Sequence, residues 1–147
     1  MKLETGPRSH LRIEAFVLSL IADLEGPSRL LPEDGPEWLL TACRAAERPE
    51  VFRAGAAGFV GVTGRAHAHV SRTARRFMGQ TPSDFVNTIR MDHAARRLIS
   101  TDDSLTEIAR DCGIVNMSHF HRLFKSRHGA TPRAWRARKQ REAVQPA

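Results

Sequence analysis

The sequence predicts an all-α protein in which a long helix joins two helix-turn-helix units, with an extra amphipathic helix in front of them. Three observations support this fold class. Residues 105–128 contain two helical patterns separated by a glycine. Residues 82–100 form a longer helical pattern with apolar side chains on more than one face. The segments on either side of that long pattern match each other at an offset of fifty residues, so one unit is expected twice.

The N-terminal part is expected to form a separate amphipathic helix. Residues 11–25 place their apolar side chains on one broad stripe, which needs a partner surface. That partner is either the core of the same chain, or a second copy or a neighbouring domain. The following GPSRLLPEDG has two prolines and two glycines and predicts a linker. We therefore expect a helix and linker at 1–34, a main domain at 35–141 and a tail at 142–147.

The main domain is expected to begin with two helices of unequal strength. Pro36 stands where a proline is favoured in a first helical turn, and apolar residues follow at helical spacing. The Arg48-Pro49 pair ends this helix. Residues 51–63 are rich in glycine and alanine, so we expect a weak helix there whose stability comes from its surroundings.

The internal repeat places the first helix-turn-helix unit at about 57–78 and the second at 105–128. Its matched pairs are Arg72 with Arg122, Gly79 with Gly129, Thr81 with Thr131, and Pro82 with Pro132. In each copy a glycine ends one helix, and a Thr-Pro pair caps and opens the next. The helix opened by Pro82 is expected to run to about Ser100 and to touch both units.

The second unit has clear helix signals. Ser104 and Glu107 form a capping box, Gly113 supplies the turn, and Asn116 caps a helix that Gly129 ends. Apolar residues of that helix form one face. The neighbouring face is polar and cationic and consists of Ser118, His121, Arg122 and Lys125. The same positions of the first copy hold Ala68, Ser71, Arg72 and Arg75.

The charge distribution favours a polyanionic partner for the second half of the chain. Residues 1–64 contain seven Lys or Arg and nine Asp or Glu, a net charge of −2, whereas residues 65–147 contain sixteen and seven, a net charge of +9. Such asymmetry is typical of nucleic-acid binding, although a solvated helical surface can carry a similar charge.

The joining helix of about nineteen residues would span roughly 28 Å. This length is close to the one-turn spacing of about 34 Å between major-groove segments, so one chain is expected to contact two of them.

The cationic faces give a candidate set of DNA contacts. Arg72 and Arg122 are the strongest candidates for base contacts, because a guanidinium can bond guanine O6 and N7 together. His121 and Ser118 could bond base edges or face solvent. The residues further along the helices and the helix starts suit phosphates, and these are Arg75, Thr81, Asn116 and Lys125. A basic tail could add salt-dependent affinity or be solvated, and it contains Arg133, Arg136, Arg138, Lys139 and Arg141.

Other functional classes find little support. The sequence has no nucleophile elbow, HExxH motif or P-loop, so we expect no enzyme and no cofactor. Its His-x-His pairs point to different sides of a helix, which argues against a metal site. Cys43 and Cys112 are expected to be reduced core residues. No long apolar run or secretory signal is present, so we expect a cytoplasmic protein with no membrane partner.

Residues 36–138 resemble the DNA-binding half of the AraC/XylS family of bacterial transcription regulators. The most specific match is LTEIARDCGIVNMSHFHRLFKSRHGATPRAW, and the first copy, GRAHAHVSRTARRFMGQTPSDFVNTIRMDHAARRL, is similar to the subgroup that carries a cupin-like sensor. The resemblance implies seven helices, a double-stranded DNA partner and RNA polymerase as a protein partner. It also implies base-facing positions at Ala68, Ser71, Arg72, Ser118, His121 and Arg122.

Four positions depart from the family pattern. Ile114 replaces an aromatic residue, and Ala74 replaces a large aromatic in the first unit, where looser packing is expected. Ala66 replaces a serine cap, which removes about 1 kcal/mol of stabilisation, and Ala68 offers a base only a methyl group.

Two functions from different classes therefore remain open. The first is a sequence-specific transcription regulator that inserts two recognition helices into adjacent major-groove segments. The second is a protein-interaction module that retains the fold but binds DNA weakly or without specificity. In either case residues 11–25 could contact a second copy or a sensor domain missing from this sequence.

Overall fold

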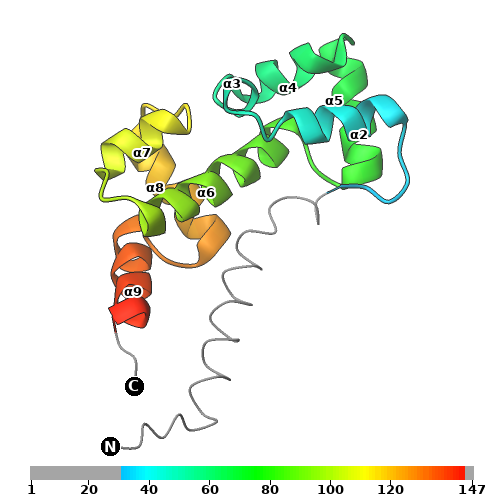
Figure 1. Cartoon of the computed structure of the whole chain (residues 1–147). Helices are drawn as coiled ribbons and strands as arrows, with labels where there is room; N and C mark the ends of the chain where they lie inside the picture. The colour runs from blue at the N-terminus through cyan, green and yellow to red at the C-terminus, as the bar shows by residue number, and fades with distance from the viewer. Residues whose placement is uncertain (1–30, 145–147) are drawn as a thin grey trace, which may run out of the picture.

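The computed structural model describes residues 31–144 of the chain, and this part is helical throughout, without a strand. The amphipathic helix expected at 11–25 lies outside the described residues. With the labels of Figure 1, the described helices are α2 (Glu37–Ala45), α3 (Pro49–Phe52), α4 (Gly55–Thr63), α5 (His67–Met78), α6 (Pro82–Ser100), α7 (Leu105–Asp111), α8 (Met117–His128) and α9 (Pro132–Val144). None of these helices is long and apolar enough to cross a membrane.

The helices form two lobes on one long helix. Figure 1 shows α2 to α5 around one end of α6, and α7 to α9 around its other end. We call these groups the first lobe and the second lobe. Each lobe has its own core of buried apolar side chains. The predicted all-α architecture of two helix-turn-helix units and a joining helix is therefore confirmed.

Helix α6 holds the lobes together because it has an apolar surface for each of them. Its first half places Phe85, Val86 and Ile89 in the core of the first lobe. Its second half places Met91, Ala94, Ala95 and Leu98 in the core of the second lobe. The helix begins with a capping box, in which the Asp84 backbone N–H donates to Thr81 Oγ1 at 3.1 Å. The bounds predicted for this helix from its cap and its apolar pattern agree with the structure.

The region before the first unit differs from the sequence prediction. Pro36 is the N-cap residue of α2 and not part of its first turn. The stretch expected as one weak helix at 51–63 contains parts of two helices, because Pro49 opens the short α3 and Gly55 starts α4 with a positive φ of 69°. Gly58 explains the tight packing of the two helices, since a Cβ atom there would lie 2.3 Å from the Val51 carbonyl oxygen.

The second unit has the predicted local structure. Ser104 and Glu107 form the capping box of α7, and Gly113 makes the turn before α8 with a φ of 77°. Cys43 and Cys112 are buried and free, as predicted. Burial raises the pKa of their thiols to about 11 and about 12 respectively, so both remain protonated near neutral pH.

Candidate nucleic-acid interface

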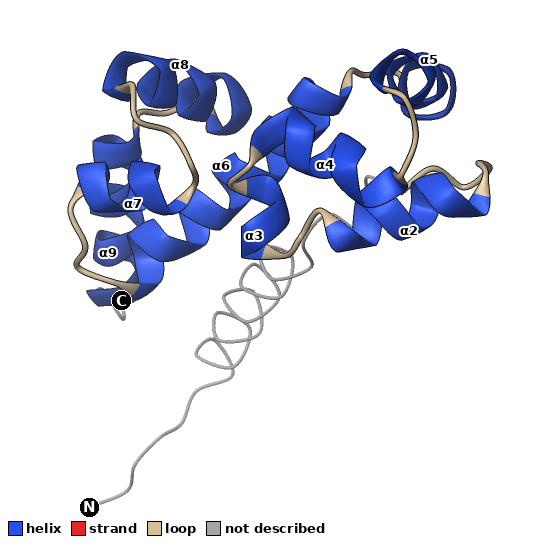
Figure 2. Ribbon diagram, turned by 90° about the horizontal axis from the view of Figure 1, so that it is seen from above, coloured by secondary structure: helices blue, strands red, loops and turns tan. Residues whose placement is uncertain are grey.

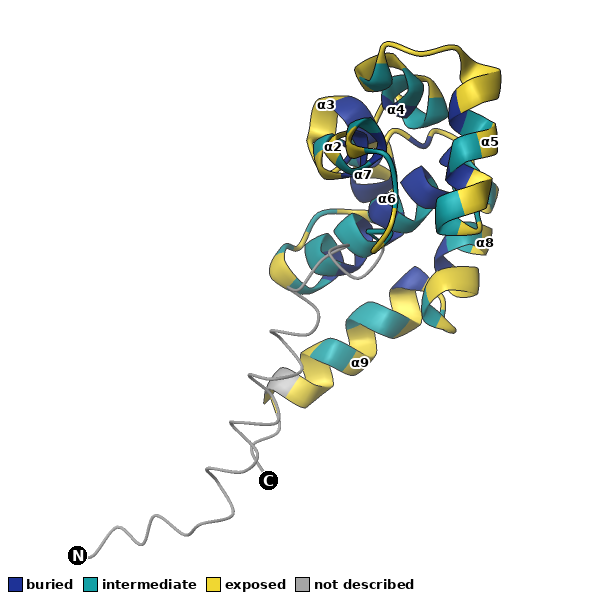
Figure 3. Ribbon diagram, turned by 90° about the vertical axis from the view of Figure 1, so that its right-hand side faces the viewer, coloured by how far each residue is buried: buried dark blue, intermediate teal, exposed yellow. Residues whose placement is uncertain are grey.

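Helices α5 and α8, the second helices of the two units, lie on the same side of the molecule. They lie together along the upper edge in Figure 2 and along the right-hand edge in Figure 3. In Figure 2, α5 is seen nearly along its axis whereas α8 runs across the view, so the two axes are not parallel. We call α5 and α8 the recognition helices. Every candidate base-reading residue belongs to one of them.

Helix α5 is anchored by small apolar side chains and carries its cations outward. Val70 and Ala74 are buried in the first lobe, while Ala68, Arg72 and Arg75 are exposed and Ser71 is half-buried. Its N-cap residue is Ala66, whose side chain makes no capping hydrogen bond. The sequence predicted that this helix start has no side-chain cap, and the structure confirms it.

Helix α8 is anchored by two aromatic rings and is better capped. Phe120 and Phe124 are fully buried, and the Asn116 side-chain oxygen accepts a hydrogen bond from the His119 backbone N–H at 2.9 Å. On its outer side, Ser118, Arg122 and Lys125 are exposed, and His121 is half-buried.

The two recognition helices are electrostatically one-sided. Neither contains an aspartate or glutamate, so every ionisable side chain on them is an arginine, a lysine or a histidine. Within the described part of the chain, Arg72, Arg75 and Lys125 form no ion pair with a carboxylate, and each is exposed. Arg127 differs, because Asp92 of α6 accepts two hydrogen bonds from its guanidinium at 3.0 Å each. Arg127 thus joins α8 to α6, while the other three cations face solvent.

Arg122 has an oriented guanidinium. Its Nη2 lies 3.0 Å from Nδ1 of His119, one helical turn earlier on α8. Arginine has no acceptor atom, so this contact requires His119 Nδ1 to be unprotonated. The contact restricts the rotamers of Arg122 before any ligand arrives, which lowers the entropy lost on binding.

The two helix starts predicted to bind phosphate are not equivalent. At Thr81, the backbone N–H and the hydroxyl both lie within hydrogen-bond distance of the Asp84 carboxylate, at 3.4 and 2.6 Å. A negative charge at that end of α6 disfavours a phosphate. The first turn of α8, which follows Asn116, contains no acidic residue. Of the two, the start of α8 is the better anion site.

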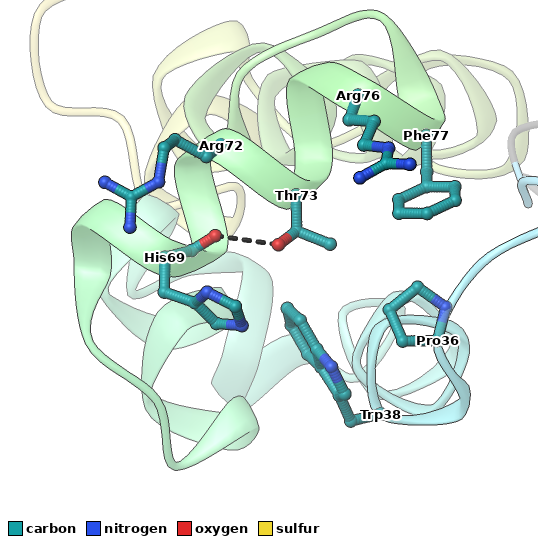
Figure 4. Close-up of a pocket in the computed structure, with 7 residues that line it drawn as sticks. All are labelled: Pro36, Trp38, His69, Arg72, Thr73, Arg76 and Phe77. Carbon is teal, nitrogen blue, oxygen red and sulfur yellow. Dashed lines mark hydrogen bonds between the residues drawn. The ribbon is translucent and has the colours of Figure 1, made fainter.

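A cluster around Trp38 was not predicted from the sequence. The centroid of the Trp38 ring of α2 lies 5.5 Å from that of the His69 ring of α5. The Arg65 guanidinium lies 4.7 Å from the centroid of the Trp38 ring. The ring also borders an open pocket of about 640 Å³ beside Arg72 and Phe77, shown in Figure 4. In the sequence, Trp38 is one of the apolar residues that follow Pro36 at helical spacing. The contacts of Trp38 with α5 join residues that are far apart in the sequence. The local sequence pattern does not indicate such contacts.

The basic tail is partly structural. Arg136 donates from Nε to the Leu98 carbonyl at 3.1 Å and from Nη2 to the Asp103 carbonyl at 2.7 Å. It therefore satisfies backbone oxygens at and after the end of α6. The Trp135 ring lies beneath Arg138 and Lys139, at 5.0 and 5.4 Å from their charged groups. Arg136, Arg138 and Lys139 thus contact the protein itself, whereas the sequence predicted either salt-dependent binding or a solvated tail.

No candidate metal centre accompanies these helices in the part of the chain that the structure covers. Between residues 31 and 144, no group of three His, Cys, Asp or Glu side chains is placed to hold a metal ion. The surface is cationic and projects from the lobes on two helices. Such a surface can bind a polyanion through hydrogen bonds and charge, over a distance longer than one helix.

Comparison with known proteins gives matches over the region that contains α5 and α8. A family described as a helix-turn-helix domain matches residues 60–138. The chain is 37% identical over 68 residues to the uncharacterized HTH-type transcriptional regulator YisR of Bacillus subtilis, covering 46% of this chain and 24% of the relative. It is 35% identical over 65 residues to the HTH-type transcriptional activator RhaS of Pectobacterium carotovorum, covering 44% of this chain and 23% of that protein.

The fold also has solved counterparts. A transcriptional regulator from Chromobacterium violaceum, described as having an AraC-type DNA-binding domain, superposes with a TM-score of 0.61 at 22% identity. The match covers 74% of this chain and 95% of that structure. The curated relatives are longer, and the aligned part is about a quarter of their length.

Proposed function

The chain belongs to the AraC/XylS family of helix-turn-helix, DNA-binding transcription regulators, and from this premise we propose that it reads two adjacent major-groove segments of one duplex with α5 and α8. One observation carries this proposal. Two anchored helices without acidic residues project exposed cations from the same side of the molecule, one from each lobe. A duplex has the complementary charge along its whole length, so both helices can bind it together.

We assign base contacts to the exposed side of each recognition helix. Arg72 and Arg122 would each bond a guanine, where one good bidentate pair gives about 1–3 kcal/mol of discrimination. Ser71, Ser118 and His121 would add single hydrogen bonds, and the Ala68 methyl would contact a thymine methyl.

Phosphate contacts would fix the position of the helices on the duplex. Arg75 and Lys125 lie further along their helices and are exposed, which suits them to the DNA backbone. The first-turn N–H groups of α8 after Asn116 would bind a further phosphate. Thr81 remains a weaker candidate because of the Asp84 carboxylate beside it.

The relative directions of α5 and α8 affect how DNA would be bound. Successive grooves on one face of a straight duplex are related by translation, so two helices inserted in the same way would be parallel. The axes of α5 and α8 are not parallel. We therefore propose that the two helices enter their grooves at different angles or that the duplex bends between them.

We propose a regulatory, non-enzymatic role in the cytoplasm and contact with RNA polymerase. We also propose that residues 11–25 contact a second copy or a sensor domain. The cupin-like sensor suggested by the subgroup resemblance stays a prediction.

Selection of bound sites from random DNA tests the main proposal. We expect a two-part motif whose centres lie about one helical turn, roughly 10 base pairs, apart. Binding to it should weaken steeply as salt rises. Equal and weak binding to every duplex would contradict the proposal and favour a protein-interaction module.

A further inference from the structure

The two lobes contact each other directly, beside the helix that joins them. Arg53 lies at the carboxyl end of α3 in the first lobe and reaches Asp111 at the end of α7 in the second. Its Nε donates to the Asp111 backbone oxygen at 2.7 Å, and its Nη2 forms an ion pair with the Asp111 carboxylate. One arginine thus bonds both the backbone and the side chain of the opposite lobe.

The middle of α6 completes this contact. Arg90 donates from Nε to the Phe52 carbonyl at 2.7 Å and from Nη2 to the Arg53 carbonyl at 2.9 Å. His93, one turn further along α6, places Nε2 2.8 Å from the Asp111 carboxylate. The lobes therefore meet over the point where α6 passes from one core to the other.

The backbones of the two lobes are also in close contact at this place. A Cβ atom on Gly113 would lie 2.3 Å from the Arg53 carbonyl oxygen, closer than any side chain permits. Gly113 also needs its positive φ for the turn before α8. We call Arg53, Arg90, His93, Asp111 and Gly113 the interlobe junction.

The junction differs from an isolated surface ion pair. An isolated exposed pair contributes little because water and salt screen it. Here the Asp111 side chain is 22% exposed, and Arg53, His93 and Arg97 all lie within ion-pair distance of its carboxylate. Burial raises the pKa of this carboxyl, but the His93 hydrogen bond and the Arg53 charge outweigh it and hold the pKa below its usual value.

Each side of the junction lies before one recognition helix in the chain, separated from α5 by α4 and from α8 by a short turn. Arg53 precedes α4 and α5, and Gly113 forms the turn before α8. We propose that the interlobe junction fixes the placement of α5 relative to α8. If the proposed function holds, on which this second step rests, the junction thereby determines the distance between two DNA half-sites that the chain accepts. Its members act as positioning residues and need not touch DNA.

Distance measurements between the recognition helices test the junction without DNA. Arg76 on α5 and Ser126 on α8 are exposed, and cysteines placed at both can carry spin labels. The two native thiols, with pKa values of about 11 and about 12, react slowly by comparison. We expect one narrow distance distribution in the labelled parent and a clearly broader one after Asp111→Ala.

A matched control removes a similar ion pair inside one lobe. Asp92→Ala deletes the bidentate contact with Arg127, which joins α6 to α8 within the second lobe. This variant should keep a distance distribution narrower than that of Asp111→Ala. Asp111→Asn, which keeps the side-chain size, serves if the alanine variant loses its helical circular dichroism. Equal widths for the parent and the Asp111 variants would overturn the inference.

Half-site spacing tests the functional consequence. On the selected motif, inserting two base pairs between the half-sites should weaken the parent about tenfold or more and Asp111→Ala about threefold or less. Affinity for a single half-site should change less than about twofold. An unchanged spacing dependence in Asp111→Ala would refute the inference. Absence of any specific site for the parent would refute the proposed function instead, and the distance measurements would still decide the role of the junction.

Discussion

On the exposed side of α8, two cations one turn apart have different surroundings. Arg122 is oriented by the ring of His119, whereas Lys125 is exposed and has no ion-pair partner in the described part of the chain. A planar guanidinium held in one direction suits a base edge, and a flexible ammonium suits a phosphate. The two residues should therefore contribute differently to affinity and to specificity.

Replacing each of these cations by alanine should separate the two contributions. Arg122→Ala should cost about 1–3 kcal/mol and relax the base preference in one half of the motif only. Lys125→Ala should weaken all sequences alike and lower the slope of log affinity against log salt by about one. Titrations of matched and mutated duplexes at several salt concentrations measure both effects. Uniform losses in both variants would contradict the assigned roles.

Two glycines of α4 should respond in opposite ways to alanine. A Cβ atom at Gly61 would meet no atom within 4 Å, so Gly61→Ala should raise the free energy of unfolding by about 0.5–1 kcal/mol through helix propensity. Gly58→Ala should lower it, because its Cβ would lie 2.3 Å from the Val51 carbonyl oxygen. Urea unfolding of both variants compares them directly, and stabilisation by both would contradict the packing of α3 on α4.

At the scale of elements, the two recognition helices differ in how they begin. The Asn116 side chain caps α8, whereas Ala66 leaves the first N–H groups of α5 without a side-chain partner. The backbone of Ala66, with φ −64° and ψ 140°, already has the extended conformation of an N-cap residue. Only the capping oxygen is missing.

Supplying that oxygen should stabilise the first lobe. Ala66→Ser should add about 1 kcal/mol to the free energy of unfolding, and Asn116→Ala should remove a similar amount. For a domain of this size the shift in Tm is roughly 4 °C in each direction. Thermal unfolding followed by circular dichroism measures it. A lower Tm for Ala66→Ser would show that the cap geometry is wrong.

For the whole molecule, the interlobe junction links stability to acid. The carboxyl of Asp111 has a pKa below its usual value in the folded chain, so its contribution is fully present above the unfolded pKa of about 3.9. That contribution is lost as the pH falls through the lower folded pKa. The free energy of unfolding should thus decrease below about pH 4.

A comparison of variants isolates the contribution of Asp111. The Arg97 hydrogen bond lowers the pKa of Asp103, and the Ser104 backbone lowers that of Glu107, so both add to the same acid dependence. Asp111→Asn should leave the contributions of Asp103 and Glu107 unchanged. It should make the plot of unfolding free energy against pH less steep than that of the parent. Urea unfolding between pH 2 and pH 6 gives the slopes, and equal slopes for the parent and Asp111→Asn would contradict the role given to this carboxylate.

The sequence alone determined the features that depend on near neighbours. The caps at Thr81, Ser104 and Asn116 each involve a residue three positions away, and the apolar faces repeat every three or four positions. These signals established the helices from α5 onward and the all-α class. The fifty-residue repeat predicted two recognition helices and which of their residues lie on the same face of each helix.

Only the tertiary structure decided how the two units are held together. Arg53 and Asp111 are 58 residues apart, Arg136 reaches a carbonyl 38 residues earlier, and neither contact follows from a local pattern. In the sequence, Gly58 looks like a weak helix former and Gly113 like a turn residue, yet each is also required by the close approach of another backbone. Periodicity records which side of a helix is buried, but the partner of that side, and therefore the relative placement of α5 and α8, is set by contacts between distant segments.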